Sequence, residues 1–175
     1  ATTALGQLGG KEAIAALKRQ LADDSAMAVR AAALVHLLNL DAADAAVLVT
    51  ASKINDENVQ CIAARSLANK CKDPKQRDLA KTTLKKLTNS SDAMTAAMAS
   101  LGLLAMGDST QLPDLKKFIS NPDTDATIVR LMMLQIADEK ITEGAPLARM
   151  VIDAPKLSVE TRVIACRALA ETSPK

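Results

Sequence analysis

The residue types that carry catalytic or metal chemistry are few in this sequence and stand apart from one another. His36 is the only histidine, and no Cys, Asp or Glu lies three or four residues from it, where one helical turn would supply a second metal ligand. The paired carboxylates Asp23-Asp24 and Asp56-Glu57 fall in turn-like segments, where helix capping explains them. The sequence contains no phosphate-binding glycine loop and no nucleophile motif. We therefore expect no enzyme activity, no cofactor and no metal.

One spacing of charged residues indicates binding instead. Arg77, Lys81 and Lys85 follow at intervals of four residues, which places three like charges on one face of a helix. Each such pair costs about 0.2–0.5 kcal/mol in an isolated helix, so the stripe suggests an external anion. The competing interpretation is a solvated surface, because most basic residues here stand near expected helix C-termini, where cations offset the helix dipole.

The composition shows which elements must position these residues. Hydrophobic residues make up 49% of the 175 residues and charged residues 24%, which is typical of a globular protein. The apolar share is mainly Ala, Leu, Val, Ile and Met, with Phe118 as the only aromatic, and this favours helices. The net charge of +2 does not by itself imply nucleic acid or a membrane. The longest uncharged run, residues 93–107, is too short to span a bilayer.

An internal repeat organises the whole chain. Six register marks are spaced 29 to 36 residues apart, in the range of helical-hairpin solenoids: Ala1, Arg30, Gln60, Met94, Arg130 and Arg162. Apolar residues recur three, four and seven positions after each mark, which traces one face of a helix. The sequence thus predicts an amphipathic first helix, here called helix A, in every repeat. The residues three positions after the marks are Ala4, Ala33, Ala63, Ala97, Met133 and Ala165.

A second helix, helix B, is expected after a breaker in each repeat. The expected breakers are Gly9-Gly10, Asp41, Asp73-Pro74, Gly107-Asp108, Asp138 and Ser173-Pro174. The expected B helices cover residues 11–21, 44–54, 75–87, 112–119 and 144–152, and together they carry a net charge of +8. Pro113 and Pro146 fit the first turns of their helices, where a missing N–H costs nothing. Acidic and Asn/Ser-rich turns separate the repeats and are expected to cap the next helix.

These patterns predict an all-α protein: a right-handed α-α superhelix of about five helical hairpins, truncated at both ends. We expect one domain over residues 1–175, with repeats at approximately 1–24, 25–57, 58–91, 92–124, 125–157 and 158–175. The sequence starts without Met inside a helical pattern, so we expect a segment of a longer protein.

The chain resembles HEAT-like repeats of the type named after phycobilisome lyases. The resemblance is carried by residues 4–17, Asp23-Asp24, and residues 29–34, 101–108 and 112–115, and Val129-Arg130 and Thr161-Arg162-Val163 repeat part of it. Gln60 and Met94 stand where the pattern has Arg, and the second and fifth repeats lack the glycine stop. The resemblance implies an α-α superhelix that serves as a protein-binding scaffold. It does not imply lyase activity.

The recurring arginines and the cysteines have expected structural roles. Arg30, Arg130 and Arg162 each follow an acidic turn, so we expect them to pair with turn carboxylates or carbonyls, with ligand contact as the alternative. Cys61 and Cys71 would lie about 15 Å apart on one helix, too far for a disulfide. We expect free thiols that pack as small apolar groups, and from them a cytoplasmic location.

The leading functional hypothesis is a non-enzymatic protein–protein interaction scaffold that binds its partner along a concave face lined by the B helices. The partner is expected to be a protein, acidic or phosphorylated, and not a membrane; the oligomeric state is left open. The alternatives are binding of nucleic acid or another polyanion by the same basic groove, and a structural spacer within a larger protein. The candidate contact residues are Lys18, Lys53, Arg77, Lys81, Lys85, Lys116, Lys117 and Arg149.

Overall fold

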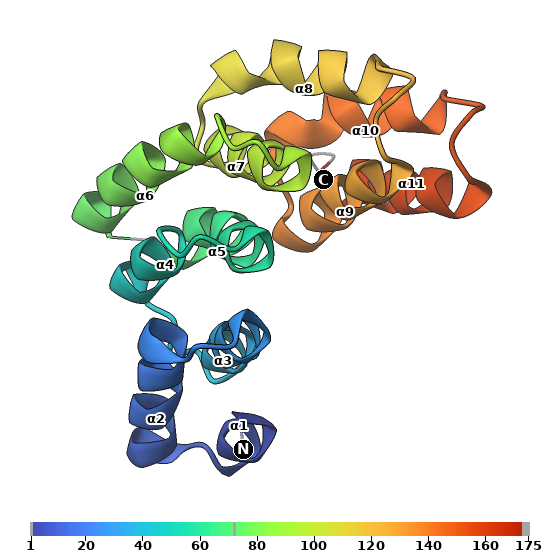
Figure 1. The fold of residues 1–175 in the computed structure, drawn as a ribbon. Coiled ribbons are helices and arrows are strands. Elements are labelled where there is room, and N and C mark those ends of the chain that lie inside the picture. Colours follow the sequence, from blue (N-terminus) through green and yellow to red (C-terminus); the bar gives the residue numbers. More distant parts are fainter. Residues whose placement is uncertain (1, 72, 173–175) are drawn as a thin grey trace. The chain divides into compact units, whose positions relative to one another are not determined.

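The computed structural model describes residues 2–71 and 73–172, and every regular element in these ranges is a helix (Figure 1). This confirms the predicted all-α class. The described ranges contain eleven α-helices and two short 3₁₀ helices. The chain divides into two compact units, residues 1–96 and 97–175, here called the N-terminal and the C-terminal unit.

The N-terminal unit packs six helices in two layers (Figure 1). The helices are α1 (Thr2–Leu8), α2 (Gly10–Asp23), α3 (Met27–Asn39), α4 (Ala45–Ala51), α5 (Glu57–Lys70) and α6 (Pro74–Leu87). The odd-numbered helices α1, α3 and α5 pack on one another in sequence, and so do α2, α4 and α6. Each layer also packs on the other, because α2 contacts α3 and α4 contacts α5.

The C-terminal unit begins within α7 (Ala93–Ala105). It continues with η1 (Ser109–Gln111), α8 (Leu112–Ser120), α9 (Ala126–Glu139), η2 (Thr142–Gly144), α10 (Ala145–Ile152) and α11 (Val159–Thr172). Helix α11 packs along α9 on one side and against α10 on another, and α8 contacts α10. The two 3₁₀ helices precede α8 and α10 and were not anticipated from the sequence.

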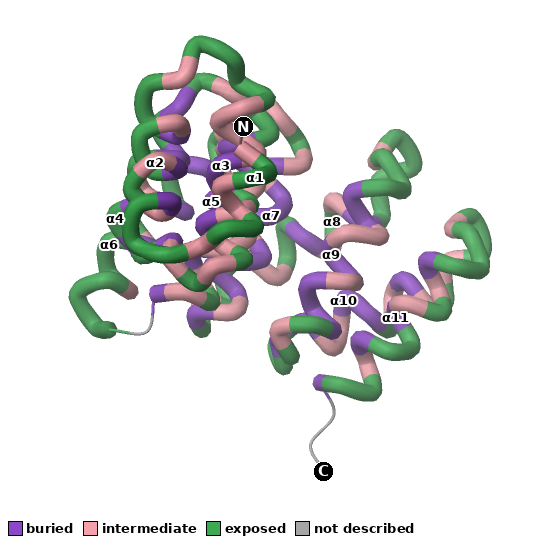
Figure 2. The backbone as a smooth tube through the Cα atoms, turned by 90° about the horizontal axis from the view of Figure 1, so that it is seen from below, coloured by how far each residue is buried: buried purple, intermediate pink, exposed green. Residues whose placement is uncertain are grey.

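The expected apolar face of the A helices is buried in the interior repeats (Figure 2). The residues three positions after the register marks are buried from the second repeat onward, at Ala33, Ala63, Ala97, Met133 and Ala165. The first repeat departs from the prediction. Ala4 is exposed and Leu8 is 79% exposed, since no described helix covers that side of α1.

Positive φ angles occur at the predicted glycines, a conformation that costs glycine little. Gly9 and Gly10 lie at the junction of α1 and α2, and Gly107 follows α7. Asp41 adopts the same conformation with φ 53°, as its position after α3 requires.

Two predicted breakers are wrong. Helix α9 continues through Asp138 to Glu139, and Lys140 takes the left-handed position. Asp73-Pro74 starts α6 rather than stopping α5: Asp73 is the N-cap and Pro74 lies in the first turn, where its ring fits. The predicted stop at Ser173-Pro174 and the first register mark, Ala1, lie outside the described residues.

Acidic turn residues cap the helices as the sequence predicts. The Asp44 and Asp56 carboxylates accept the N–H groups of Val47 and Val59, each at 2.9 Å. Asp125 accepts the N–H of Thr127 at 2.8 Å, and hydrogen bonds from the Thr127 backbone and side chain hold the pKa of Asp125 below its usual range. Pro113 and Pro146 occupy the first turns of α8 and α10.

The described cysteines are free thiols; Cys61 and Cys71 are buried and Cys166 is exposed. Burial raises the pKa of the Cys61 and Cys71 thiols. A search of the described helices for a segment with the length and apolar character of a membrane span found none.

Candidate functional site

The eight candidate contact residues divide between the two units. Lys18 lies on α2, Lys53 follows α4, and Arg77, Lys81 and Lys85 lie on α6. The C-terminal unit holds Lys116 and Lys117 on α8 and Arg149 on α10. One placement corrects the prediction: α4 ends at Ala51, so Lys53 stands in the turn beyond the helix and not on it.

Helix α6 presents the basic stripe that the spacing predicts. It is continuous from Pro74 to Leu87, so successive members of the stripe lie one turn apart on the same side. Arg77 and Lys81 are half-buried, and Lys85 is exposed. No ion pair joins Arg77 or Lys81 to another described residue.

The basic residues of α8 and α10 are also unpaired within the described ranges. Lys117 and Arg149 are exposed, Lys116 is half-buried, and none of them forms an ion pair with a described residue. All three lie in the second half of short helices, where the helix dipole favours a cation by about 0.3–1 kcal/mol. The helix dipole explains why these cations can stand there without an acidic partner. Their N–H donors therefore remain available to bind an external anion.

Lys18 is the exception among the candidates. Its Nζ lies 3.7 Å from Asp44 Oδ2, and the two side chains are 42% and 57% exposed. The pair flanks a hollow of about 230 Å³ between α2 and α4, whose other lining residues are Leu21, Ala22, Ala46, Val47 and Thr50. The hollow therefore combines an apolar floor with one cation and one carboxylate at its edge.

Four cations on or directly after odd-numbered helices are engaged in ion pairs between neighbouring repeats. Lys70 Nζ, on α5, lies 2.5 Å from the Oδ1 of Asp41, which follows α3. The other three pairs join α9, or the residue that ends it, to α11: Arg130–Glu160 at 2.8 Å, Asp138–Arg167 at 2.7 Å and Lys140–Glu171 at 3.4 Å. Exposed pairs of this kind contribute about 0–1 kcal/mol each, so they fix register more than they add stability.

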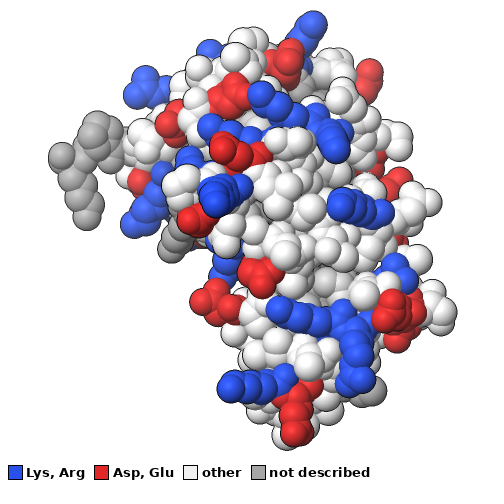
Figure 3. Space-filling view, turned by 90° about the vertical axis from the view of Figure 1, so that its left-hand side faces the viewer, with Lys and Arg blue, Asp and Glu red and all other residues white. Residues whose placement is uncertain are grey.

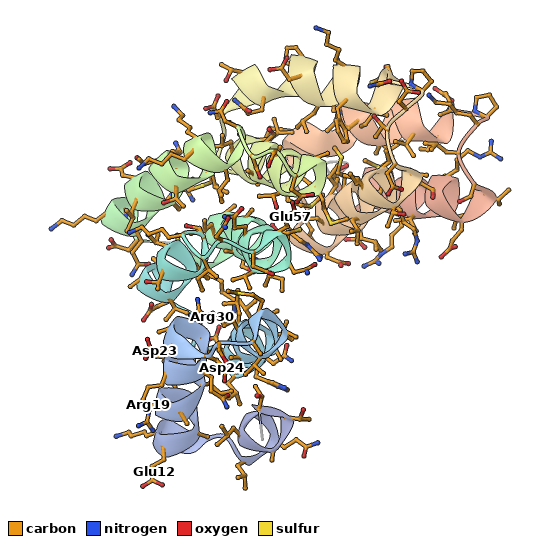
Figure 4. All side chains as sticks on the ribbon, in the orientation of Figure 1. Glu12, Arg19, Asp23, Asp24, Arg30 and Glu57 are labelled. Carbon is orange, nitrogen blue, oxygen red and sulfur yellow. The ribbon has the colours of Figure 1, made fainter. Side chains whose placement is uncertain are left out.

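Of the three recurring arginines, only Arg30 has the partner that the sequence predicts: Arg130 pairs with Glu160 in the first turn of α11, and Arg162 forms no ion pair with a described residue. Arg30 Nε donates to the backbone oxygen of Asp24 at 2.6 Å, where α2 ends and α3 begins (Figure 4). Gln60 stands at the same register and donates from Nε2 to the backbone oxygen of Ile54 at 3.0 Å, again six residues earlier. A donor at this position thus ties helix A to the preceding turn. The sequence marked Gln60 only as a departure from the pattern.

Acidic side chains are distributed among the basic ones on the face drawn in Figure 3, where Lys and Arg are interspersed with Asp, Glu and uncharged residues. Since charges are screened beyond about 8 Å at physiological salt, each basic side chain acts on its immediate surroundings. A partner would therefore meet separate contact points rather than a uniform positive field.

The remaining chemical candidate, His36, packs against a glycine. A Cβ atom built on Gly6 of α1 would lie 2.2 Å from His36 Nδ1, so the absence of a side chain at Gly6 lets the imidazole of α3 approach α1. Sequence reasoning treated Gly6 only as part of a motif. Among the described residues, no cluster of three His, Cys, Asp or Glu side chains could hold a metal ion.

Comparison with protein-family models gave no match for this sequence, and comparison with curated proteins gave none either.

Proposed function

We propose that this chain is a non-enzymatic protein-binding scaffold of HEAT-like helical repeats, which contacts an acidic or phosphorylated protein segment through its even-numbered helices. The proposal includes the finer architecture expected from the sequence: a right-handed α-α superhelix with the even-numbered helices on the concave face. The repeat pattern of the sequence and the neighbour-to-neighbour packing of the odd-numbered helices within each unit support it.

The observation that carries the proposal is the contrast between the two sets of cations. Lys70, Arg130, Lys140 and Arg167, on or directly after the odd-numbered helices, are all ion-paired. On the even-numbered helices, Arg77, Lys81, Lys116, Lys117 and Arg149 have no ion pair with a described residue. The contrast has exceptions, since Lys18 of α2 is paired with Asp44 and Arg162 of α11 has no ion pair with a described residue. The unpaired cations of α6, α8 and α10 nevertheless have donors to offer an anionic partner.

An acidic or phosphorylated polypeptide suits these donors better than single-stranded nucleic acid. Binding of single strands commonly adds stacking on aromatic side chains, and Phe118 is the only aromatic residue of the chain. Carboxylate and phosphate oxygens need only N–H donors, which lysine and arginine supply.

The test is capture of partners from a lysate of the source cells with three versions of the chain. The first is native, and the second carries Arg77→Glu, Lys81→Glu and Lys85→Glu. The third is a control with the same change in charge, Lys140→Glu, Lys156→Glu and Arg167→Glu. These control residues are exposed and lie off the even-numbered helices: Lys140 directly follows α9, Arg167 is on α11 and Lys156 is in a connecting segment. Circular dichroism checks that all three versions fold.

We expect the native chain and the control to capture the same protein, and the α6 variant to capture about tenfold less of it, irrespective of nuclease treatment. Capture that disappears with nuclease and falls steeply with salt would replace the proposal with nucleic-acid binding. Equal capture by all three versions, or none, would show that these cations only offset helix dipoles and that the chain is a spacer.

A further inference from the structure

The hollow between α2 and α4 has an apolar floor and the size of a site for a single side chain. Leu21 and Val47, which line it, are buried, and the exposed Ala22 and Ala46 stand beside them. Its volume is about 230 Å³. Sites for whole small molecules are commonly larger, about 300–1,000 Å³. The hollow therefore suits one large side chain of a bound polypeptide.

The edge of the hollow holds one hydrogen-bond donor and one acceptor that do not satisfy each other. Lys18 Nζ lies 3.7 Å from Asp44 Oδ2, which is too far for a direct hydrogen bond. Neither atom is hydrogen-bonded to another residue in the described part of the chain, because Asp44 caps α4 at the N–H of Val47 through its other oxygen, Oδ1. Thr50 has already used its hydroxyl proton, which it donates to the backbone oxygen of Ala46 at 2.9 Å.

These two groups select the kind of side chain that the hollow can bind. A polar tip placed between Lys18 and Asp44 has to accept from an ammonium group and donate to a carboxylate, while the body behind it stays apolar. The tyrosine hydroxyl both donates and accepts, and its ring is apolar. Tryptophan can only donate, phenylalanine and leucine can do neither, and serine and threonine lack the apolar body. The chemistry of the hollow therefore matches tyrosine.

The hollow belongs to the same layer as the basic stripe of α6. Helix α2 packs on α4 and α4 packs on α6 within the N-terminal unit (Figure 1). In a repeat array each repeat contacts only its neighbours, so an additional repeat would stack beside α2 and α4 and not between them. The hollow is thus accessible to a segment that binds along this layer.

We propose that the hollow between α2 and α4 binds a tyrosine side chain of the acidic segment that contacts α6, with the tyrosine hydroxyl accepting from Lys18 and donating to Asp44. The assignment of the tyrosine to that segment rests on the function proposed above, whereas the affinity of the hollow for a phenol does not. Residues 1–175 contain no tyrosine, so none of them can be this occupant. The tyrosine is the unphosphorylated form, because the carboxylate of Asp44 would repel a phosphate.

The probe is N-acetyl-tyrosinamide, which is uncharged and carries the phenol, and N-acetyl-phenylalaninamide is the comparison without the hydroxyl. Backbone amide chemical shifts of the isotope-labelled full chain measure binding and locate it. Ala22→Leu fills the hollow, and its matched control is Ala15→Leu, an exposed alanine on the same helix that does not line the hollow. Asp44→Asn keeps an oxygen for the cap of α4 but puts an NH₂ donor in place of the second acceptor.

We expect the tyrosine amide to shift the residues that line the hollow with a Kd of about 1–10 mM, and the phenylalanine amide to bind about fivefold more weakly. Ala22→Leu should weaken both by at least about fivefold, and Ala15→Leu should change neither. Asp44→Asn should lower the affinity for the tyrosine amide to that for the phenylalanine amide and leave the latter unchanged.

A second measurement connects the hollow to α6. A peptide that joins a tyrosine to three glutamates through a flexible Gly/Ser linker should bind the native chain about tenfold more tightly than the tyrosine amide. The chain with Arg77→Glu, Lys81→Glu and Lys85→Glu should lose this gain and bind the tyrosine amide as the native chain does.

The inference would be overturned by the absence of saturable shifts around the hollow, by equal affinities for the two amides, or by equal losses with Ala22→Leu and Ala15→Leu. Each of these results would hold even if α6 captures an acidic partner. Tighter binding of the phosphorylated tyrosine amide would also overturn it. A linked peptide that gains nothing from its glutamates would remove the tyrosine from the acidic segment, while phenol binding in the hollow remained.

Discussion

Gly6→Ala offers a quantitative test of the packing between α1 and α3, because two effects of known size oppose each other. Alanine is more favourable than glycine inside a helix by about 0.8–1 kcal/mol, which would stabilise α1. The new Cβ, however, would lie 2.2 Å from His36 Nδ1, 2.5 Å from its Cγ and 2.8 Å from its Cε1. The clash involves the ring atom nearest the backbone, so rotating the ring tip cannot relieve it.

Either the imidazole or α1 must therefore move by about 1 Å, and overpacking of this kind costs about 1–3 kcal/mol. We expect the clash to exceed the helix-propensity gain, with a net destabilisation of about 1–2 kcal/mol. In a His36→Ala background the ring is gone, so the same Gly6→Ala change should stabilise the protein by up to about 1 kcal/mol. Ala4→Gly is the control for helix propensity alone, because Ala4 is exposed on the same helix.

Urea denaturation measures the free energy of unfolding for the four members of the Gly6/His36 cycle. Amide hydrogen exchange of α1 accompanies it, because a terminal seven-residue helix can also relieve the clash by separating from α3. This account of the packing would be refuted if Gly6→Ala, with His36 native, left the hydrogen exchange of α1 unchanged and did not lower the free energy of unfolding. So would an identical effect in both backgrounds.

Three other substitutions or conditions follow from the same structure. Lys140→Gly should raise the free energy of unfolding by about 0.5–1 kcal/mol, because glycine adopts the left-handed backbone at φ 53° without strain and the exposed ion pair with Glu171 that is lost contributes less. Thermal denaturation measures this, and a lower melting temperature would contradict it. Gly144→Ala should destabilise by about 1–3 kcal/mol, since its Cβ would lie 2.9 Å from Ile136 Cγ1, whereas an unchanged urea midpoint would show that Ile136 can yield. Burial raises the pKa of the Cys61 and Cys71 thiols in the folded chain, so the folded state keeps protons that the unfolded state releases above about pH 8.5. Their stabilising contribution is complete below that pH and is lost as the pH rises, so the melting temperature should fall more steeply above it than in the Cys61→Ala, Cys71→Ala variant; equal slopes would contradict the pKa shifts.

The helical class and the buried face of the interior repeats could be predicted from the sequence because both depend on local periodicity. Residues at offsets of three and seven from Arg30 and Gln60 are buried in the structure as the pattern requires. The helix boundaries were less predictable. Where α4 and α9 end depends on the local backbone conformation, which the apolar pattern does not specify. Helix α4 ends before Lys53, which lies in a turn, and Lys140 rather than Asp138 takes the left-handed conformation after α9.

The charge contrast between the two layers could not be predicted, because it depends on contacts between residues about 30 positions apart. Lys70 and Lys117 are both lysines near expected helix ends, and only the structure shows that Lys70 meets Asp41. The role of Gln60 was missed for a similar reason. Glutamine and arginine differ in size and charge, but both carry a side-chain N–H donor. Only the structure shows that Arg30 and Gln60 each donate to the backbone oxygen of the residue six positions earlier.

The ion pairs between successive odd-numbered helices also bear on how the chain folds. Their partners are separated by 29 to 31 residues in the sequence, as in Arg167 with Asp138 and Lys140 with Glu171. Closing loops of this length costs little entropy, and chains dominated by short-range contacts fold fast. Folding can therefore start at any pair of adjacent repeats and extend repeat by repeat, so a damaging substitution in one repeat should slow the steps around it and leave more distant repeats able to form.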